Sequence, residues 1–184
     1  SRRGSRRVSL RATDAMSDGP GGGWALERPT GAVEELHAPV GPISGRVVIV
    51  NEVEAPTLVL GSSQAGVEVA PGLDVVRRSS GGGAVLLRPD GVLWVDVLIP
   101  RGDPLWEDDI GRSTWWLGGV WSAALADLGV EAGVHRGRME PGRWGGLACF
   151  AGIGPGEVLG GGRESVGVSQ RRDRFGARCR CAGL

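Results

Sequence analysis

Two arginines and three glycines follow one another in the segment Arg77-Arg78-Ser79-Ser80-Gly81-Gly82-Gly83-Ala84. Successive glycines let a backbone approach a ligand closely, and their N–H groups can form an anion-binding nest. Arginine adds bidentate contacts to phosphate or carboxylate. No Gly-Lys-Ser/Thr follows, so this is not a Walker A loop. The segment predicts a loop that wraps an anionic ligand, and a flexible hairpin loop with solvated arginines is the alternative.

A second glycine-rich stretch, GGGRESVGVSQRR at 160–172, combines a turn with a strand that alternates Val166 and Val168 with small or polar residues. Its alternative is a surface hairpin whose arginines confer solubility. No nucleophile is evident, because Ser169 has no histidine nearby in the sequence and a Ser-His-Asp triad is unsupported. The segment GIGPGE at 152–157 contains a proline and no surrounding βαβ unit, so it predicts a turn and not a dinucleotide site.

The cationic and metal-binding side chains limit the possible chemistry. All 21 cationic residues are arginines, and arginine cannot serve as a titrating amine. Cys149, Cys179 and Cys181 are too few for a disulfide framework, and His37 and His135 lie far from them in sequence. No metal site is therefore predicted. Reduced cysteines are typical of a cytoplasmic protein. No apolar run reaches the roughly 18 residues of a membrane span, so no membrane partner is expected.

The elements that must position these segments form a strand-rich pattern with one long helix. Apolar residues recur at helical spacing from about 106 to 128, and a short helix is expected at 31–38 with Thr30 as N-cap. The segment Pro89-Asp90-Gly91 predicts a hairpin between strands 84–87 and 92–99. In the second of these, the face of Leu93, Val95, Val97 and Ile99 is expected to be core. Further strands are predicted at 46–53, 57–61, 73–78, 147–151, 157–158, 163–169 and 177–181.

This order predicts an α+β domain with a mixed or antiparallel sheet and helices packed on it. With 184 residues, one globular domain is expected. Residues 1–23 are predicted to be a disordered Arg/Gly-rich tail, and residues 24–184 the folded domain. The chain stops at Leu184 in a strand-like region, which is consistent with truncation of the domain at its C-terminus. Residues 1–15 carry five arginines and one aspartate. This tail, with Arg171, Arg172 and Arg174, leaves an Arg-rich nucleic-acid-binding protein as a less favoured alternative.

Three segments, taken in order, resemble lipoate-protein ligase A in its actinobacterial form: APTLVLGSSQ (55–64), RRSSGGGAV (77–85) and GGRESVGVSQRR (161–172). The resemblance covers about 24–184 and implies the biotin/lipoate ligase fold, which is like that of class II aminoacyl-tRNA synthetases. It implies that lipoate or octanoate is activated with ATP and Mg²⁺ as an acyl-adenylate. The acyl group would then pass to a lysine of a lipoyl carrier domain, either an E2 subunit or the H protein. A non-catalytic acyl- or carrier-binding homologue and an octanoyltransferase are the alternatives.

The resemblance also implies a set of site residues. Those matching the adenylate-binding segments are Arg77, Arg78, Ser80, Gly81, Gly82, Gly83, Ala84, Gly162, Arg163, Gly167 and Ser169. The catalytic position, a lysine in the family, is Glu164. One unit-charge pair at ~4 Å and an effective dielectric of ~20 is worth roughly 4 kcal/mol, so this exchange predicts slow adenylate formation. Leu87 stands where many members have histidine, and no cysteine clearly matches the nucleophile of some octanoyl-transferring relatives.

Overall fold

The computed structural model describes residues 14–16 (backbone), 23–39, 41–69, 71–79, 81–144, 148–149 and 152–183. The tail predicted at 1–23 falls mostly outside the described residues; within it, the backbone of Asp14–Met16 forms strand β1. Strand β1 pairs antiparallel with β2 (Trp24–Glu27). The pairing supplies partners to backbone groups that β2 would otherwise present at a sheet edge.

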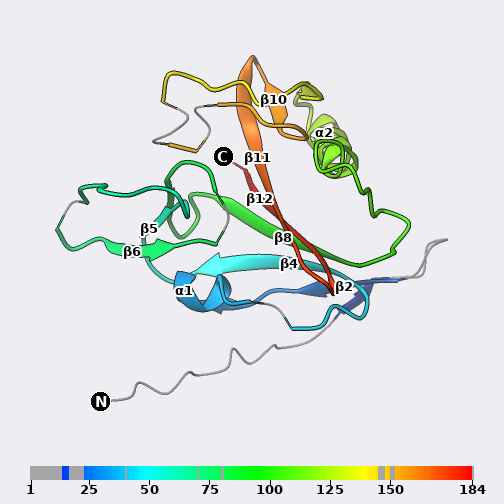
Figure 1. The fold of residues 1–184 in the computed structure, drawn as a ribbon, viewed down its shortest axis with the longest axis horizontal. Helices are drawn as coiled ribbons and strands as arrows, with labels where there is room; N and C mark the ends of the chain where they lie inside the picture. Colours follow the sequence, from blue (N-terminus) through cyan, green and yellow to red (C-terminus); the bar gives the residue numbers. More distant parts are fainter. Residues whose placement is uncertain are drawn as a thin grey trace.

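The main sheet of the described chain has mixed strand directions (Figure 1). Its strand order is β1, β2, β4 (Arg46–Val53), β8 (Leu93–Pro100), β12 (Gly176–Gly183), β11 (Arg163–Arg172), β10 (Val158–Gly160) and β9 (Ala132–Val134). The short strand β3 (Thr30–Gly31) also pairs with β4. Strands β2 and β3 run parallel to β4, whereas the other neighbours are antiparallel. The α+β class with a mixed sheet is thus confirmed.

A smaller sheet, β6 (Asp74–Arg77), β5 (Thr57–Leu60) and β7 (Val85–Leu87), carries the first glycine loop. The turn predicted before β8 is present, since Gly91 donates its N–H to the Arg88 carbonyl (3.1 Å) and Asp90 has φ 57°. The hairpin prediction is wrong, because β7 pairs with β5 while β8 pairs with β4 and β12. The side chains of Leu87 in β7 and Trp94 in β8 belong to one buried cluster. The two strands therefore face each other from different layers and are not neighbours in one sheet.

Helix α1 (Val33–Leu36) is shorter than the helix predicted at 31–38. Thr30 does not cap it, because that residue belongs to β3 and its hydroxyl donates to Glu52 (3.0 Å). Ala32 is the N-cap and is exposed, with no side-chain capping bond. Val33 and Leu36 are the buried residues of this helix.

Helix α2 (Trp115–Asp127) begins later than the predicted residue 106. Residues 107–112 are instead held by acidic side chains that bind nearby backbone N–H groups. Asp109 Oδ1 accepts from Gly111 (2.8 Å) and Arg112 (3.2 Å), and Glu107 Oε1 accepts from Asp109 (3.0 Å). Such local bonds compete with helical hydrogen bonding, so residues 107–112 do not form the first turns of the helix predicted from 106.

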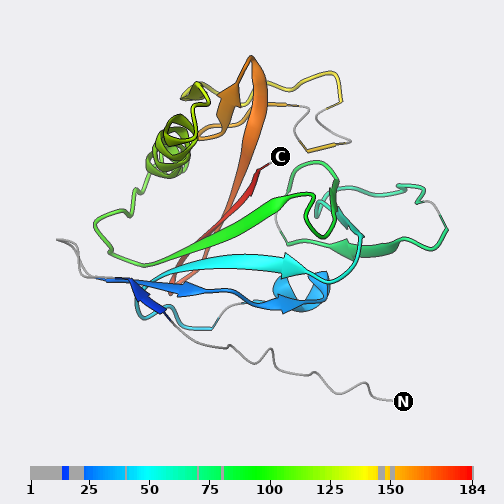
Figure 2. The same cartoon turned by 180° about the vertical axis from the view of Figure 1, so that it is seen from behind.

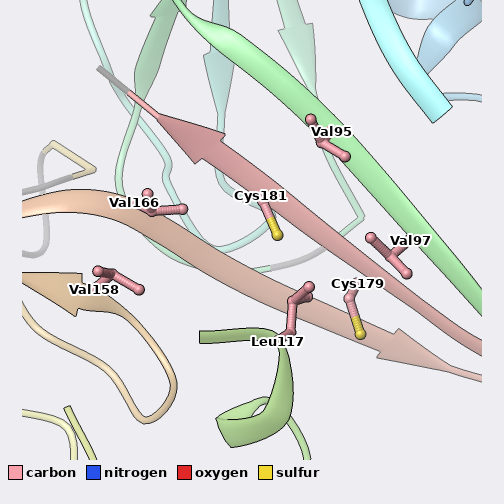
Figure 3. Close-up of a cluster of buried hydrophobic side chains, with 7 residues drawn as sticks. All are labelled: Val95, Val97, Leu117, Val158, Val166, Cys179 and Cys181. Atoms are coloured by element: carbon pink, nitrogen blue, oxygen red, sulfur yellow. The ribbon is translucent and has the colours of Figure 1, made fainter. Parts of the chain in front are cut away.

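Hydrophobic side chains are buried on both faces of β8, because the two faces meet different layers. On one face, Val95 and Val97 pack with Leu117 of α2 and with β12 thiols (Figure 3). On the other, Trp94 packs with α1 and the small sheet. Figures 1 and 2 show α2 and the small sheet on opposite sides of β11 and β12. The prediction of a single core face on this strand is therefore incomplete, because the opposite face is buried as well. Leu93, the first residue of the predicted face, is 48% exposed.

Adjacent glycines in α2 give a matched pair of stability tests. A Cβ on Gly118 would lie 2.4 Å from the Gly156 carbonyl oxygen, whereas a Cβ on Gly119 would meet nothing within 4 Å. Alanine is favoured over glycine in a helix by roughly 1 kcal/mol. We expect Gly119→Ala to raise the free energy of unfolding by about that amount and Gly118→Ala to lower it, as measured by urea denaturation. Equal effects of the two variants would contradict this packing.

Candidate functional site

The turn after β5 is closed by its own residues and by Arg77. The Gly61 N–H donates to Gln64 Oε1 (2.9 Å), and the Gln64 N–H donates to the Gly61 carbonyl (3.1 Å). Arg77 Nη1 donates to the carbonyls of Gly61 (2.8 Å) and Gln64. Arg77, predicted to contact a ligand, therefore holds the turn at residues 61–64 in place.

Arg78 organises the glycine loop from within. It is 8% exposed, and its Nη2 donates to the carbonyls of Gly81 (2.8 Å) and Gly83 (3.0 Å). The same nitrogen lies 3.2 Å from Cys149 Sγ, and that thiol donates to the Gly83 carbonyl (3.2 Å). The loop is thus held through its carbonyl groups, and Cys149 is brought against it from a segment 66 residues later.

Close backbone approach explains why glycine occupies two of these positions. A Cβ on Gly61 would lie 1.9 Å from the Gly82 carbonyl oxygen. A Cβ on Gly83 would lie 2.2 Å from the carbonyl carbon of Ala148 and 2.5 Å from the nitrogen of Cys149. Any larger residue would push the loop away from the turn after β5 or from the 148–149 segment.

A cavity of about 310 Å³ lies between the glycine loop and β11. Seven of the predicted site residues line it: Arg78, Gly81, Gly82, Gly83, Glu164, Gly167 and Ser169. Arg77, Ala84, Gly162 and Arg163 do not, and Ser80 lies outside the described residues. Much of the remaining wall is apolar, including Val59, Val85, Leu87, Trp94 and Val168. The volume of this cavity is at the low end of the roughly 300–1,000 Å³ that is typical of ligand pockets, so the cavity suits a small, largely apolar ligand.

A second cavity, of about 560 Å³, adjoins the first and is more strongly basic. The two share five wall residues: His37, Arg78, Ser169, Gln170 and Arg180. The second is also lined by Arg77, Arg171 and Arg178, against the acidic Glu34 and Asp173. Because an apolar cavity adjoins a basic one, the two together suit a ligand with an apolar chain and an anionic end.

A buried carboxylate fixes this shared wall. Asp96 is fully buried and accepts from Arg178 Nε (3.1 Å) and Nη2 (2.5 Å), and from Arg180 Nε (2.9 Å). Asn51 Nδ2 and Trp94 Nε1 each donate to it at 3.2 Å. Burial alone would raise the pKa of Asp96, but Arg180 and Arg178 hold it below its ordinary value. Asp96 is therefore ionised in the core.

His37 is held as a neutral side chain in the same wall. Arg180 Nη1 contacts His37 Nδ1, and arginine can only donate, so the imidazole proton is on Nε2. The ring also packs on Trp94, with ring centroids 4.6 Å apart. Burial, followed by the charge of Arg180, lowers the pKa of His37 to about 3. His37 is uncharged throughout the physiological pH range.

Glu164 and Glu157 face the first cavity together. Burial first, and then the charge of Glu157, raises the pKa of Glu164 to about 8. Glu164 is therefore mostly protonated at neutral pH. A Glu164 carboxylate would repel a phosphate, but this repulsion is largely absent at neutral pH. The attraction that a lysine would supply is missing at any pH.

Four charged or titratable cavity residues were not predicted as site residues from the sequence: His37, Cys149, Glu157 and Arg180. His37 and Arg180 lie 143 residues apart and meet only through the fold. Glu157 precedes the second glycine-rich segment, which begins at Gly160, by three residues, and Cys149 precedes it by 11, so only Glu157 had a signal from its position in the sequence. Among the described residues, no group of three or more His, Cys, Asp or Glu side chains could hold a metal ion. No helix in the described part of the chain is long and apolar enough to cross a membrane.

No protein-family model and no curated protein sequence matches this chain. Solved structures match its fold. Lipoate-protein ligase A bound with ATP has a TM-score of 0.56 and 19% identity, over 76% of this chain and 53% of that chain. A putative lipoate protein ligase from T. acidophilum with bound lipoic acid has a TM-score of 0.58 and 17% identity, over 79% and 56%.

A third structure, of a bipartite lipoate protein ligase and its E2 lipoyl domain from Thermoplasma acidophilum, has a TM-score of 0.53 and 17% identity, over 79% and 51%. The chain thus has the fold of the lipoate ligase catalytic domain, and it spans about half the length of these matched chains.

Removing the charge of Asp96 should destabilise the domain strongly. Asp96→Asn leaves the guanidinium groups of Arg178 and Arg180 without their buried counter-charge, which typically costs about 3–5 kcal/mol. We expect that loss in the free energy of unfolding from denaturant titration. The control is Glu107→Gln, which breaks an exposed ion pair with Arg112 (3.6 Å) and should change stability by less than about 1 kcal/mol. Similar small losses in both variants would contradict a structural role for Asp96.

Proposed function

We propose that this chain is a lipoate-ligase-like enzyme that binds lipoate or octanoate and activates it as an acyl-adenylate. The observation that carries the proposal is the 310 Å³ apolar cavity closed by the Gly81–Gly83 loop, with Arg78 and Arg180 in the wall toward the basic cavity. An acyl chain fits the apolar walls, and its carboxylate fits the arginine-containing wall. The fold it shares with ligases bound to ATP and to lipoic acid supports the same substrates.

The remaining partners follow from that chemistry. ATP is the second substrate, and its phosphates carry Mg²⁺. The acceptor is a lysine on a lipoyl carrier domain, an E2 subunit or the H protein, in keeping with the matched structure of a ligase and its E2 lipoyl domain. The three free cysteines fit the reducing cytoplasm. Adenylation by the native chain is slow, because no lysine is available to neutralise charge on the reacting phosphate.

Restoring an amine at position 164 tests the proposal. Glu164→Lys adds a cation beside the glycine loop, and an attraction of about 4 kcal/mol corresponds to roughly a thousandfold in rate. We expect ATP–pyrophosphate exchange with lipoate or octanoate to rise toward that limit. The control is Glu68→Lys, which makes the same charge change at an exposed position outside both cavities. Equal exchange by the native, Glu164→Lys and control proteins, or none in any of them, would sink the adenylation proposal.

Cys149 favours a second candidate function, acyl transfer without ATP. Its thiol lines the cavity beside Arg78 and the glycine loop, although its sequence position did not match a catalytic cysteine clearly. The Cys149 sulfur would attack the carbonyl of an octanoyl thioester, forming a new thioester while the donor thiol leaves with the proton. A carrier lysine would then take the acyl group and release Cys149.

Mass spectrometry distinguishes this second function. Incubated with an octanoyl thioester and no ATP, the native chain should gain one octanoyl group on the peptide containing Cys149, and hydroxylamine should remove it. Cys149→Ser should gain none, while Cys179 and Cys181 remain unmodified because both are buried in the core. Octanoylation that persists in Cys149→Ser would exclude this route. Octanoate binding without exchange or transfer would identify a non-catalytic acyl-binding homologue.

A further inference from the structure

A bulge in β11 directs Glu164 into the cavity. Strand β10 pairs Val158 with Val166 but Leu159 with Glu164, so β11 contains one extra residue between these pairs. In regular alternation Glu164 would lie on the same face as Val166, which is buried in the core against α2. A bulge re-aims side chains locally. Glu164 therefore lines the cavity with Gly167 and Ser169.

The two carboxyl groups of this cavity have different surroundings. Burial raises the pKa of Glu157 above its ordinary value, but contacts with its carboxyl group oppose that shift: Oε2 accepts the N–H of Gly154 (2.5 Å), and the Val168 backbone and His135 act in the same direction. Among the described residues, no donor contacts the Glu164 carboxyl, and no ion pair joins either acid to an arginine. When two acids share a site, the one with hydrogen-bond donors keeps the charge and the other keeps the proton.

We propose that Glu164 holds a proton because Glu157 is ionised beside it, and that it donates this proton in a hydrogen bond to a carboxyl or carbonyl oxygen of the bound acyl group. Glu164 then supplies, as a neutral donor, the hydrogen bond to the acyl group that a lysine at position 164 could supply as a cation. This inference rests on the proposed acyl substrate. No covalent bond forms or breaks in the step, and the proton stays on Glu164.

Four other charged or titratable side chains line the cavity and bear on this proton: Arg78, Arg180, Cys149 and His37. Arg78 is held by loop carbonyls on the opposite wall, Arg180 is bound to Asp96, and Cys149 lies beside Arg78. His37, with its pKa lowered to about 3 by burial and Arg180, does not titrate near neutrality. Because burial and Glu157 raise the pKa of Glu164 to about 8, the donor is present below that pH. Above it, Glu164 becomes a carboxylate that repels an anionic ligand.

Octanoate binding, measured calorimetrically without ATP between about pH 6 and pH 9.5, tests the inference, because octanoate stays ionised over this range. We expect the native affinity to fall above about pH 8, approaching tenfold per pH unit. Glu164→Gln should remain within a few-fold of the native affinity at low pH and lose the pH dependence. Glu157→Gln should move the fall to lower pH, because a neutral neighbour no longer favours protonated Glu164. We expect the same pH dependence of octanoate affinity in a Cys149→Ser background, where titration of this thiol cannot be its cause.

Infrared spectroscopy of the native protein follows the proton without any ligand. A protonated carboxyl band should be present near pH 7, decline through about pH 8, and be missing in Glu164→Gln. Absence of that band, or an unchanged pH dependence of binding in Glu164→Gln, overturns the inference. Failure to bind octanoate at any pH, with the band present, overturns the acyl substrate and the hydrogen bond to it while leaving the proton assigned to Glu164. The two failures are therefore distinguishable.

Discussion

The carboxylate of Asp96 is the interaction on which the site depends most directly. Desolvating one carboxylate is costly unless it is paired and hydrogen-bonded, and here donors from three strands satisfy it: Asn51 of β4, Trp94 of β8, and Arg178 and Arg180 of β12. Arg178 continues from Asp96 to the carbonyls of Leu36 and Ala38 at the end of α1 (2.8 Å each). One buried charge thus connects the sheet to the helix that supplies His37 and sets the wall between the cavities.

Periodicity predicted the elements well where a strand is long and its environment uniform. The predicted strand 46–53 agrees with β4 because both of its flanks carry turn residues and its apolar run is continuous. Prediction failed where side chains compete with the backbone, as at Asp109, or where a strand joins another layer, as at β7. Neither competition nor layer assignment is encoded in apolar spacing, because each depends on which tertiary partners are available.

The glycine loop was predictable as a unit because its residue types directly express close backbone approach. The protonation states around it were not. Glu164 and its ionised neighbour are seven residues apart, but a bulge and a buried wall decide that one stays neutral. Likewise, the tautomer of His37 is set by a guanidinium 143 residues away. Charges at such a site are properties of the folded environment, so a sequence pattern names the residues without giving their charge.

Strand β12 alternates two chemistries with a period of two. Cys179 and Cys181 enter the core against α2, while Arg178 and Arg180 point to Asp96 on the other face. Insertion or deletion of a single residue within this strand would exchange the faces, placing guanidinium groups against Leu117 and thiols against the carboxylate. Changes in chain length can therefore be accommodated here in the turn at 173–175, outside the strand, but not within it.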